Sequence, residues 1–428
     1  MRCSSSSSTT VRVSSSCTKT PPKAPVCTRP SSPKPSTPAP APAPGKGHGG
    51  GSVFEPSKPS APSASDKARA QAVSAMDEVL NAQANREQGY NGAVVVQDAA
   101  NVERAENTNP RSSRYKAAQA QVKQHEALEQ QQLARLSPQE RARYATVRQE
   151  LVAANNPVAT LALQKLLVSG RLEKGTDFLG QGSVLQHLSD IARGNDLDRR
   201  VDRQTLLTDL VQELATPSAI NQGSRGTCAP TALSIGLNIE RPAEYARIMK
   251  AAASTSGAVK LVDGSTLYRE KDTAFTDDRS GRALTQRLLA PIFMEASNGK
   301  DDYRDSASKD KRNAGATARE LDALYDAVYG HDMAFDTRNK STWMDRIRSE
   351  LAEGQSVLAG IKYGSGGHQL LVTGLETIKG TEYVKYINPW GQHERMAAAE
   401  FHARMNGLNY DTRPAQTLRQ EHRAFLAA

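Results

Sequence analysis

The chain is 428 residues long, which suits two domains with tails, and it contains no apolar run long enough to predict a transmembrane helix. Its formal charge is +9, but residues 1–65 supply +7 of this charge through eight Lys or Arg residues and one Glu. The rest of the chain is therefore nearly balanced, which argues against a nucleic-acid-binding groove in the folded part.

Residues 1–65 are of low complexity, with serine runs followed by alternating Pro and Ala and then by three glycines. Such a segment buries too little apolar surface to offset its ordering entropy, so we expect a disordered tail with an extended polyproline part. A spacer is the simplest role. A delivery or docking signal is the alternative, because this Ser-rich N-terminus resembles those of bacterial effectors exported by type III systems.

The tail also bears on location, because it lacks the apolar core of a secretory signal peptide. If the protein is secreted or translocated, we expect a signal-peptide-independent route. The cytoplasm is the alternative location. The sequence does not decide between the two.

Residues 66–214 are predicted to be a helical region. Val73, Met76, Val79 and Leu80 recur at helical spacing, and the valines at 94–96 suggest a short strand. Ser137-Pro138-Gln139-Glu140 is a capping box with Pro at the first helical position. It opens a helix to about residue 154. Further helices are expected over 113–136, 157–170, 184–192 and 203–214.

The function of this helical region is open between three possibilities. It could be an inhibitory pro-segment that covers a catalytic cleft, a domain that binds a substrate or partner, or a structural cap. We favour the structural and partner roles, because the helical pattern continues to within a few residues of position 222. That spacing leaves little linker to cut.

Cys228 is the only cysteine after Cys27. It follows a turn that Gly223 and Gly226 make flexible, and the sequence becomes apolar and helix-compatible from Ala229 onward, with Pro230 suited to a first turn. We therefore expect Cys228 at a helix N-terminus, where unpaired N–H groups favour a thiolate. A buried structural cysteine is the alternative. The lone body cysteine predicts neither a disulfide framework nor a zinc site, since no CxxC or HExxH pattern is present.

Helices continue after Cys228 and strands dominate the end of the chain. Asp263-Gly264 predicts a hairpin between 258–262 and 265–270, and Thr317-Ala318-Arg319-Glu320 is a second capping box. Residues 298–315 are charged and are predicted to form a loop. Helices are expected over 242–253, 284–296 (with a kink at Pro291), 318–329 and 341–351, and strands over 357–363, 368–378 and 382–387. Helices first and antiparallel strands last predict an α+β fold.

Two further motifs contain residues that could act with Cys228. Gly366-Gly367-His368 opens an apolar strand far beyond the cysteine, and Asn388-Pro389-Trp390-Gly391 ends the next one. Together with Asn221-Gln222-Gly223-Ser224 before Cys228, these motifs resemble the papain-like cysteine proteases, and Asn-Pro-Trp-Gly resembles the calpain branch in particular. The family's His and Asn lie roughly 130–150 residues after the Cys. The sequence departs from the family at Ala229, where an aromatic residue is usual.

The resemblance covers about residues 215–410 and implies a papain-like catalytic domain made of a helical half and an antiparallel sheet half. The helical region 66–214 and the tail 1–65 precede this domain, and a C-terminal tail, 411–428, follows it. Neither a metal nor an organic cofactor is implied. No EF-hand loop accompanies the calpain-like motif, so calcium dependence is not expected either.

The resemblance also implies a role for each site residue. Cys228 would be the nucleophile and His368 its base, as a thiolate–imidazolium pair. Asn388 would hold the imidazole tautomer, Trp390 would shield that hydrogen bond, and Gln222 would donate to the oxyanion with the Cys228 N–H. Gly226 and Gly367 would line the substrate cleft. Each residue also has a plain structural role open to it, as turn, loop or core. His331 and His393 lack a comparable context.

The resemblance thus implies a cysteine peptidase that hydrolyses peptide bonds of a protein or peptide substrate. The same three side chains serve acyl or amide transfer, deamidation and the removal of ubiquitin-like modifiers, so an enzyme of that kind is the alternative. A non-catalytic binding protein on the same fold is the second alternative. The intact set Cys228, His368, Asn388 and Gln222 argues against it.

Overall fold

The computed structural model describes residues 63–81, 83–86, 92–98, 104–297, 303–305, 315–364 and 366–413. They belong to one compact unit, Ala61–Ala428. The expected tail 1–65 and the C-terminal tail lie almost wholly outside the described residues. The helices are α1 (Ala64–Leu80), α2 (Ser113–Gln124), α3 (Glu126–Leu133), α4 (Pro138–Ala153), α5 (Pro157–Val168), α6 (Val184–Arg193), α7 (Arg203–Ala215), α8 (Cys228–Glu240), α9 (Pro242–Ala253), α10 (Leu284–Ser297), α11 (Ala318–Tyr329), α12 (Trp343–Ala352) and α13 (Ala398–Arg404).

The strands fall into a large sheet and a short hairpin. The large sheet has the order β1-β2-β9-β8-β7-β6-β10-β5, and every pairing in it is antiparallel. The hairpin is β3 with β4. The strands are β1 (Gln83–Arg86), β2 (Val94–Asp98), β3 (Ala258–Lys260), β4 (Thr266–Tyr268), β5 (Met333–Asp336), β6 (Val357–Tyr363), β7 (Gly366–Ile378), β8 (Thr381–Asn388), β9 (Gln392–Ala397) and β10 (Met405–Asp411). The fold is therefore mixed α+β with a large antiparallel sheet, as the order of the predicted elements indicates.

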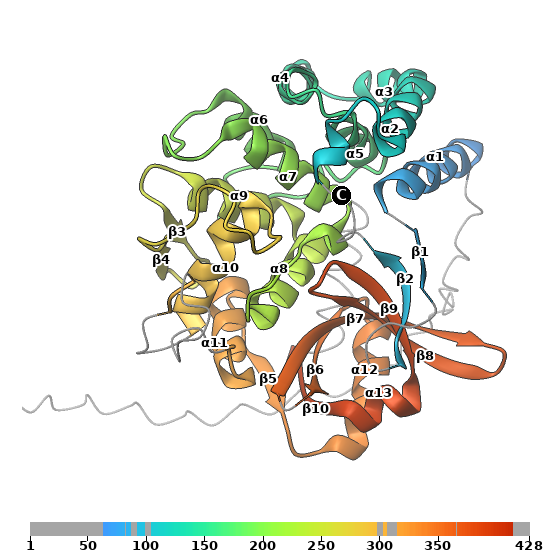
Figure 1. Ribbon diagram of the computed structural model, residues 1–428, viewed down its shortest axis with the longest axis vertical. Helices are drawn as coiled ribbons and strands as arrows, with labels where there is room; N and C mark the ends of the chain where they lie inside the picture. The colour runs from blue at the N-terminus through green and yellow to red at the C-terminus, as the bar shows by residue number, and fades with distance from the viewer. Residues whose placement is uncertain are drawn as a thin grey trace, which may run out of the picture. The chain divides into compact units, whose positions relative to one another are not determined.

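Two hydrophobic clusters cover the two faces of the sheet, as the period-two alternation of its strands requires. On one face Leu358 and Leu371 belong to a cluster that also includes α8. On the other face Val357 and Val372 pack with Trp343 of α12 and with α13. Figure 1 shows α8 in green crossing beside the orange and red strands, and α8 contacts β7. This packing brings the start of α8 to the sheet.

The N-terminal region is continuous with the rest of the fold. β2 pairs with β9, so residues before position 100 extend the C-terminal sheet (Figure 1). The cluster that includes α8 also includes Leu163 of α5 and Leu210 of α7. Residues on both sides of position 215 therefore share one core. None of the described helices is long and apolar enough to cross a membrane.

Most predicted elements lie within a few residues of their expected bounds, because their start signals act locally. Ser137 and Thr317 form the capping boxes that the sequence predicts, and Asn156 caps α5. The helix expected over 113–136 is wrong as a single element, because the backbone at His125 leaves helical conformation and separates α2 from α3. The elements β5, β9, β10 and α13 were not predicted from the sequence. Most of the loop expected over 298–315 lies outside the described residues.

Candidate active site

Cys228 begins α8, as its sequence context predicts. The preceding residue, Thr227, makes no side-chain capping hydrogen bond to the helix. The first N–H groups of α8 are thus not used by a side-chain cap among the described residues, and they are oriented to stabilise an anion at the helix start. The Cys228 side chain is half-buried. The N–H groups of Ala229 and of Gln369 lie close enough to its sulfur to act on its pKa.

That contact joins two segments that are far apart in the sequence, because Gln369 directly follows His368 on β7. His368 is buried, and its Nε2 lies 2.9 Å from Oδ1 of Asn388 at the end of β8. Within the described part of the chain, Nδ1 of His368 has no hydrogen-bond partner. The imidazole is therefore hydrogen-bonded at Nε2, and its Nδ1 is available as a base.

Two aromatic rings enclose the imidazole of His368. The Trp390 indole stacks on it with centroids 4.4 Å apart, and the Tyr363 ring lies 5.5 Å away. Tyr363 and Trp390 also meet edge to face at 5.0 Å. His368 and Asn388 are both buried, so their hydrogen bond lies in a low local dielectric, and the shielding role of Trp390 stays a prediction.

Burial sets the protonation of the candidate pair. It raises the pKa of the Cys228 thiol, although nearby N–H groups offset part of that rise. It lowers the pKa of His368, although the hydrogen bond to Asn388 offsets part of that fall. Both directions favour the neutral forms, since desolvation penalises charge. These directions do not by themselves favour a thiolate–imidazolium pair, which stays a prediction.

The backbone of the loop before Cys228 is hydrogen-bonded to the loop that contains Trp390. The Gln222 N–H donates to the Pro389 carbonyl at 2.8 Å, and Asn221 forms an isolated antiparallel bridge with Trp390. The Gln222 side chain is buried, and its amide Nε2 donates to the Arg225 carbonyl at 2.6 Å. One N–H of the Gln222 amide is thereby used within the loop. The other N–H is the predicted donor to an oxyanion.

The loop that contains Asp278 and Ser280 contacts the loop before Cys228. Ser224 donates its N–H to the Ser280 carbonyl at 2.9 Å, and Arg225 pairs with Asp278 at 3.2 Å. Asp278 also pairs at 2.6 Å with Arg282, whose side chain is fully buried. Gly223 has φ +58°, and a Cβ on it would lie 2.0 Å from the Ser280 oxygen. Only glycine fits this contact, which explains the first glycine of the motif.

Glu394 of β9 also contacts the predicted site, and sequence reasoning missed it. It is buried, and its Oε1 accepts a hydrogen bond from Asn388 Nδ2 at 3.0 Å. The Tyr386 hydroxyl also donates to this carboxylate. No local signal marks the residue, because β9 was not predicted. Without the β8–β9 pairing, the contact with Asn388 cannot be derived.

The remaining predicted residues lie as follows. Gly226 and Gly367 are both exposed, and a Cβ on Gly367 would come no closer than 3.5 Å to another atom. Their place in a cleft stays a prediction. His331 lies elsewhere, bonded to Asp411 at 2.9 Å. Burial, together with nearby Lys385, lowers the pKa of His393 to about 4. The structure thus groups His368, rather than these two histidines, with the predicted partners.

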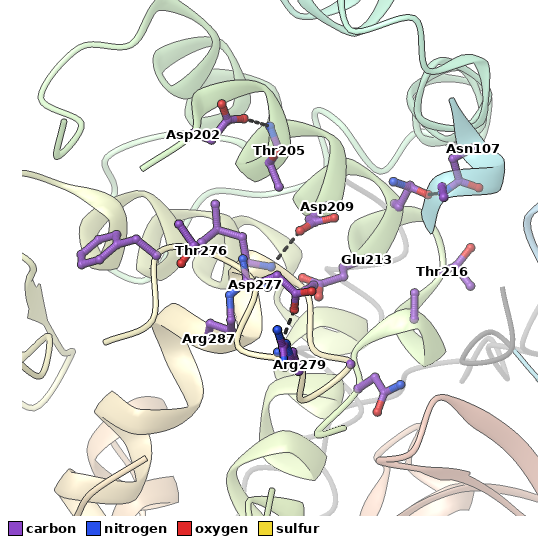
Figure 2. Close-up of a pocket in the computed structure, with 18 of the residues that line it drawn as sticks. Asn107, Asp202, Thr205, Asp209, Glu213, Thr216, Thr276, Asp277, Arg279 and Arg287 are labelled. Carbon is purple, nitrogen blue, oxygen red and sulfur yellow. Dashed lines mark hydrogen bonds between the residues drawn. The ribbon is translucent and has the colours of Figure 1, made fainter. Parts of the chain in front are cut away.

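A cavity of about 930 Å³, with both polar and apolar lining surface, adjoins the loop of Gln222 through Asn221. Figure 2 shows Asp209 and Glu213 of α7 on one wall and Asp277 and Arg279, from the loop before α10, on another. Among the described residues, neither Cys228 nor His368 lines it. The cavity therefore lies beside the candidate site without containing its reactive groups.

No known protein-family model matches this chain, and comparison with curated proteins and with solved structures finds no significant similarity.

Proposed function

We propose that the chain is a cysteine peptidase that hydrolyses peptide bonds through an acyl-enzyme. One observation carries the proposal. The buried imidazole of His368 is held at Nε2 by Asn388, and the residue that follows it contacts the Cys228 thiol at the start of α8. A thiol, a base and a group that orients the base are the parts that nucleophilic catalysis requires.

The first half of the reaction forms the acyl-enzyme. Nδ1 of His368 takes the thiol proton as the Cys228 sulfur attacks the scissile carbonyl carbon, and negative charge develops on the carbonyl oxygen. The Cys228 N–H and the free amide N–H of Gln222 would stabilise that oxygen. Loss of one such donor costs about 2.7–4 kcal/mol in comparable sites. The imidazolium then gives its proton to the leaving amine, the C–N bond breaks, and a thioester remains.

The second half consumes water. Neutral His368 accepts a proton from the water as its oxygen attacks the thioester carbonyl. The C–S bond then breaks, Cys228 regains a proton from the imidazolium, and a carboxylic acid leaves. Asn388 holds the ring through both halves. Its role is thus to orient the ring, and removing it should weaken catalysis without abolishing it.

The first test is labelling by an epoxysuccinyl reagent, read by intact mass. A version of the protein with Cys3, Cys17 and Cys27 changed to Ser leaves Cys228 as the only thiol. We expect one adduct on this protein and none after Cys228→Ala. We also expect His368→Ala to slow the labelling at least tenfold, because the activating base is lost. Labelling at an equal rate in the His368 variant would contradict the assignment of the base.

The second test separates hydrolysis from transfer. A peptide library is incubated with the protein in ¹⁸O-water, and the products are analysed by mass spectrometry. New carboxyl termini that carry the heavy oxygen, absent with Cys228→Ala, support the peptidase. Intact peptides with an added amine, or with Gln converted to Glu, would instead support the transferase or deamidase alternative.

A further inference from the structure

The side-chain amide of Asn388 is held at both ends. Its Oδ1 faces His368 Nε2 at 2.9 Å and the Trp390 N–H at 3.3 Å, and its Nδ2 donates to Glu394 Oε1 at 3.0 Å. The Trp390 N–H can only donate, so Oδ1 of Asn388 must lie on its side, and the NH₂ end then faces Glu394. A flipped amide would set an oxygen against the carboxylate and an NH₂ against the Trp390 N–H.

The orientation of the Asn388 amide determines which nitrogen of the His368 imidazole carries the proton. With Oδ1 of Asn388 toward the ring, Nε2 of His368 has to carry its proton and donate it. Nδ1 is then the unprotonated nitrogen in the neutral ring, and this is the base that the proposed reaction needs. The two contacts that fix the Asn388 amide, to Glu394 and to the Trp390 N–H, therefore bear on the tautomer of His368.

Charge supports the same role. Glu394 is 4% exposed, and it makes no ion pair with a Lys, Arg or His among the described residues. Burial raises the pKa of Glu394, and the hydrogen bonds from Asn388 and Tyr386 offset part of that rise by favouring the ionised form. The titratable groups that face it are Tyr386 of β8 and Asp98 of β2, with Glu400 and Arg404 of α13 beyond the Tyr386 phenol. Asn388 alone separates Glu394 from His368, a group that becomes cationic during the proposed reaction.

We propose that Glu394 is a positioning residue for this site. It fixes the Asn388 amide, thereby selects the His368 tautomer with the free electron pair at Nδ1, and stabilises the imidazolium through Asn388. The proposal rests on the proposed function for its catalytic meaning, but the tautomer can be measured without activity. Glu394 touches neither substrate nor reacting atoms, so its effect is on kcat and on the state of His368.

The experiment compares Glu394→Gln and Glu394→Ala with a matched control, Glu382→Gln. Glu382 lies at the other end of β8, where it pairs with Arg348 on the surface. The full chain is labelled with ¹⁵N-histidine, and His368→Ala identifies the resonances of His368. The measurements are the tautomer and pKa of His368, together with kcat and KM on a peptide found by library screening. Thermal melting monitors folding.

We expect Glu394→Gln to keep the tautomer, because a glutamine oxygen still accepts from Asn388, and to lower the pKa of His368. Its kcat should fall by roughly three- to tenfold. Glu394→Ala should give mixed tautomers and a kcat lower by about 10- to 100-fold, the range seen when a group that orients a ligand histidine is removed. KM should stay within about twofold in both variants. Glu382→Gln should match the wild type.

Unchanged His368 resonances and kcat in folded Glu394→Gln and Glu394→Ala would overturn the proposal while leaving the peptidase intact. If Glu394→Ala fails to fold, a wild-type pKa of His368 in Glu394→Gln overturns it. If the wild-type protein cleaves no peptide, the proposed function fails, and the tautomer measurement still decides whether Glu394 sets the state of His368.

Discussion

The indole of Trp390 lies face to face with the imidazole of His368, with ring centroids 4.4 Å apart and ring planes inclined by 19°. The same residue donates its backbone N–H to Asn388 and bridges to Asn221 in the loop of Gln222. Trp390 thus contacts the predicted base, its orienting amide and the predicted oxyanion loop. The ring contacts His368 and the backbone contacts Asn388 and Asn221, so a substitution can remove the ring contact and keep the backbone contacts.

Trp390→Ala should lower kcat/KM by roughly tenfold, because ring stacking contributes about 0.5–1.5 kcal/mol and water would reach the His368–Asn388 hydrogen bond. Trp390→Phe keeps a stacking ring, so we expect it to retain most of the activity. The check is steady-state kinetics on a cleaved peptide. Trp343→Phe is the control, since Trp343 is buried in the other cluster, with α13 and β8, and its loss should alter melting more than catalysis. Equal activity of Trp390→Ala and wild type would refute the shielding role.

Gly223→Ala tests the support of the oxyanion loop. A Cβ there would lie 2.0 Å from the Ser280 carbonyl oxygen, in a backbone conformation with φ +58°. One of the two loops must move, so Gln222 should lose its place and kcat/KM should fall by at least 100-fold. Gly180→Ala is matched to it, because Gly180 has φ +66° and open space around it. That control carries a similar backbone strain, about 1–2 kcal/mol, without the clash. It should lower the melting temperature slightly and leave catalysis unchanged.

Signals confined to one segment could be predicted from the sequence. The capping boxes at Ser137 and Thr317, the helix start at Cys228 and the hairpin at Asp263-Gly264 all depend on neighbouring residues. The strands around His368 were also found, because their apolar runs are long. The missed strands β9 and β10 lie inside the sheet, β9 between β2 and β8 and β10 between β6 and β5. There Met405–Asp411 and Gln392–Ala397 mix polar and apolar residues and depend on their partners for their conformation.

The residues of the candidate site also differ in whether the sequence alone could predict them. Cys228, His368 and Asn388 stand in short recognisable motifs, so they could be selected from the sequence alone. Glu394 could not, since it meets Asn388 only through the pairing of β8 with β9. Asp278 and Ser280 support the Gln222 loop from a distant part of the sequence, just before α10. Such contacts are tertiary, and no local pattern encodes them.

Glu350 makes the stability of the protein depend on pH. It lies in the last turn of α12, where a negative charge opposes the helix dipole. Its Oε1 is 3.5 Å from Arg346, and its Oε2 is buried without a partner in the described part of the chain. Burial raises the pKa of this carboxyl to about 7, and nearby Asp411 also raises it. The folded state therefore binds this proton more tightly than the unfolded state does.

The sign of the effect follows from that difference. The stabilising contribution of Glu350 is complete below the unfolded pKa of about 4.3, and it is lost as the pH rises through about 7. Glu350→Gln removes the loss, so it should stabilise the protein at pH 8 by on the order of 2 kcal/mol and change little at pH 4. Urea unfolding at both pH values measures this. Asp345→Asn, an exposed change on the same helix, should have a small effect at both. A gain at pH 8 no larger than that of Asp345→Asn would contradict the burial argument.

Removal of the helical region should unfold the catalytic part rather than unmask it. Glu213 of α7 accepts hydrogen bonds from Tyr245 of α9 and Thr285 of α10, and its carbonyl accepts one from Asn238 of α8. A chain of residues 215–428 would leave these buried donors unpaired and would lose the α5 and α7 side of the core. We expect this chain to give no cooperative melting transition. Residues 61–428, which make up one compact unit, should melt like the full chain and label equally at Cys228. A folded, active 215–428 chain would show that the N-terminal helices are a separable segment, as a cleaved pro-segment requires.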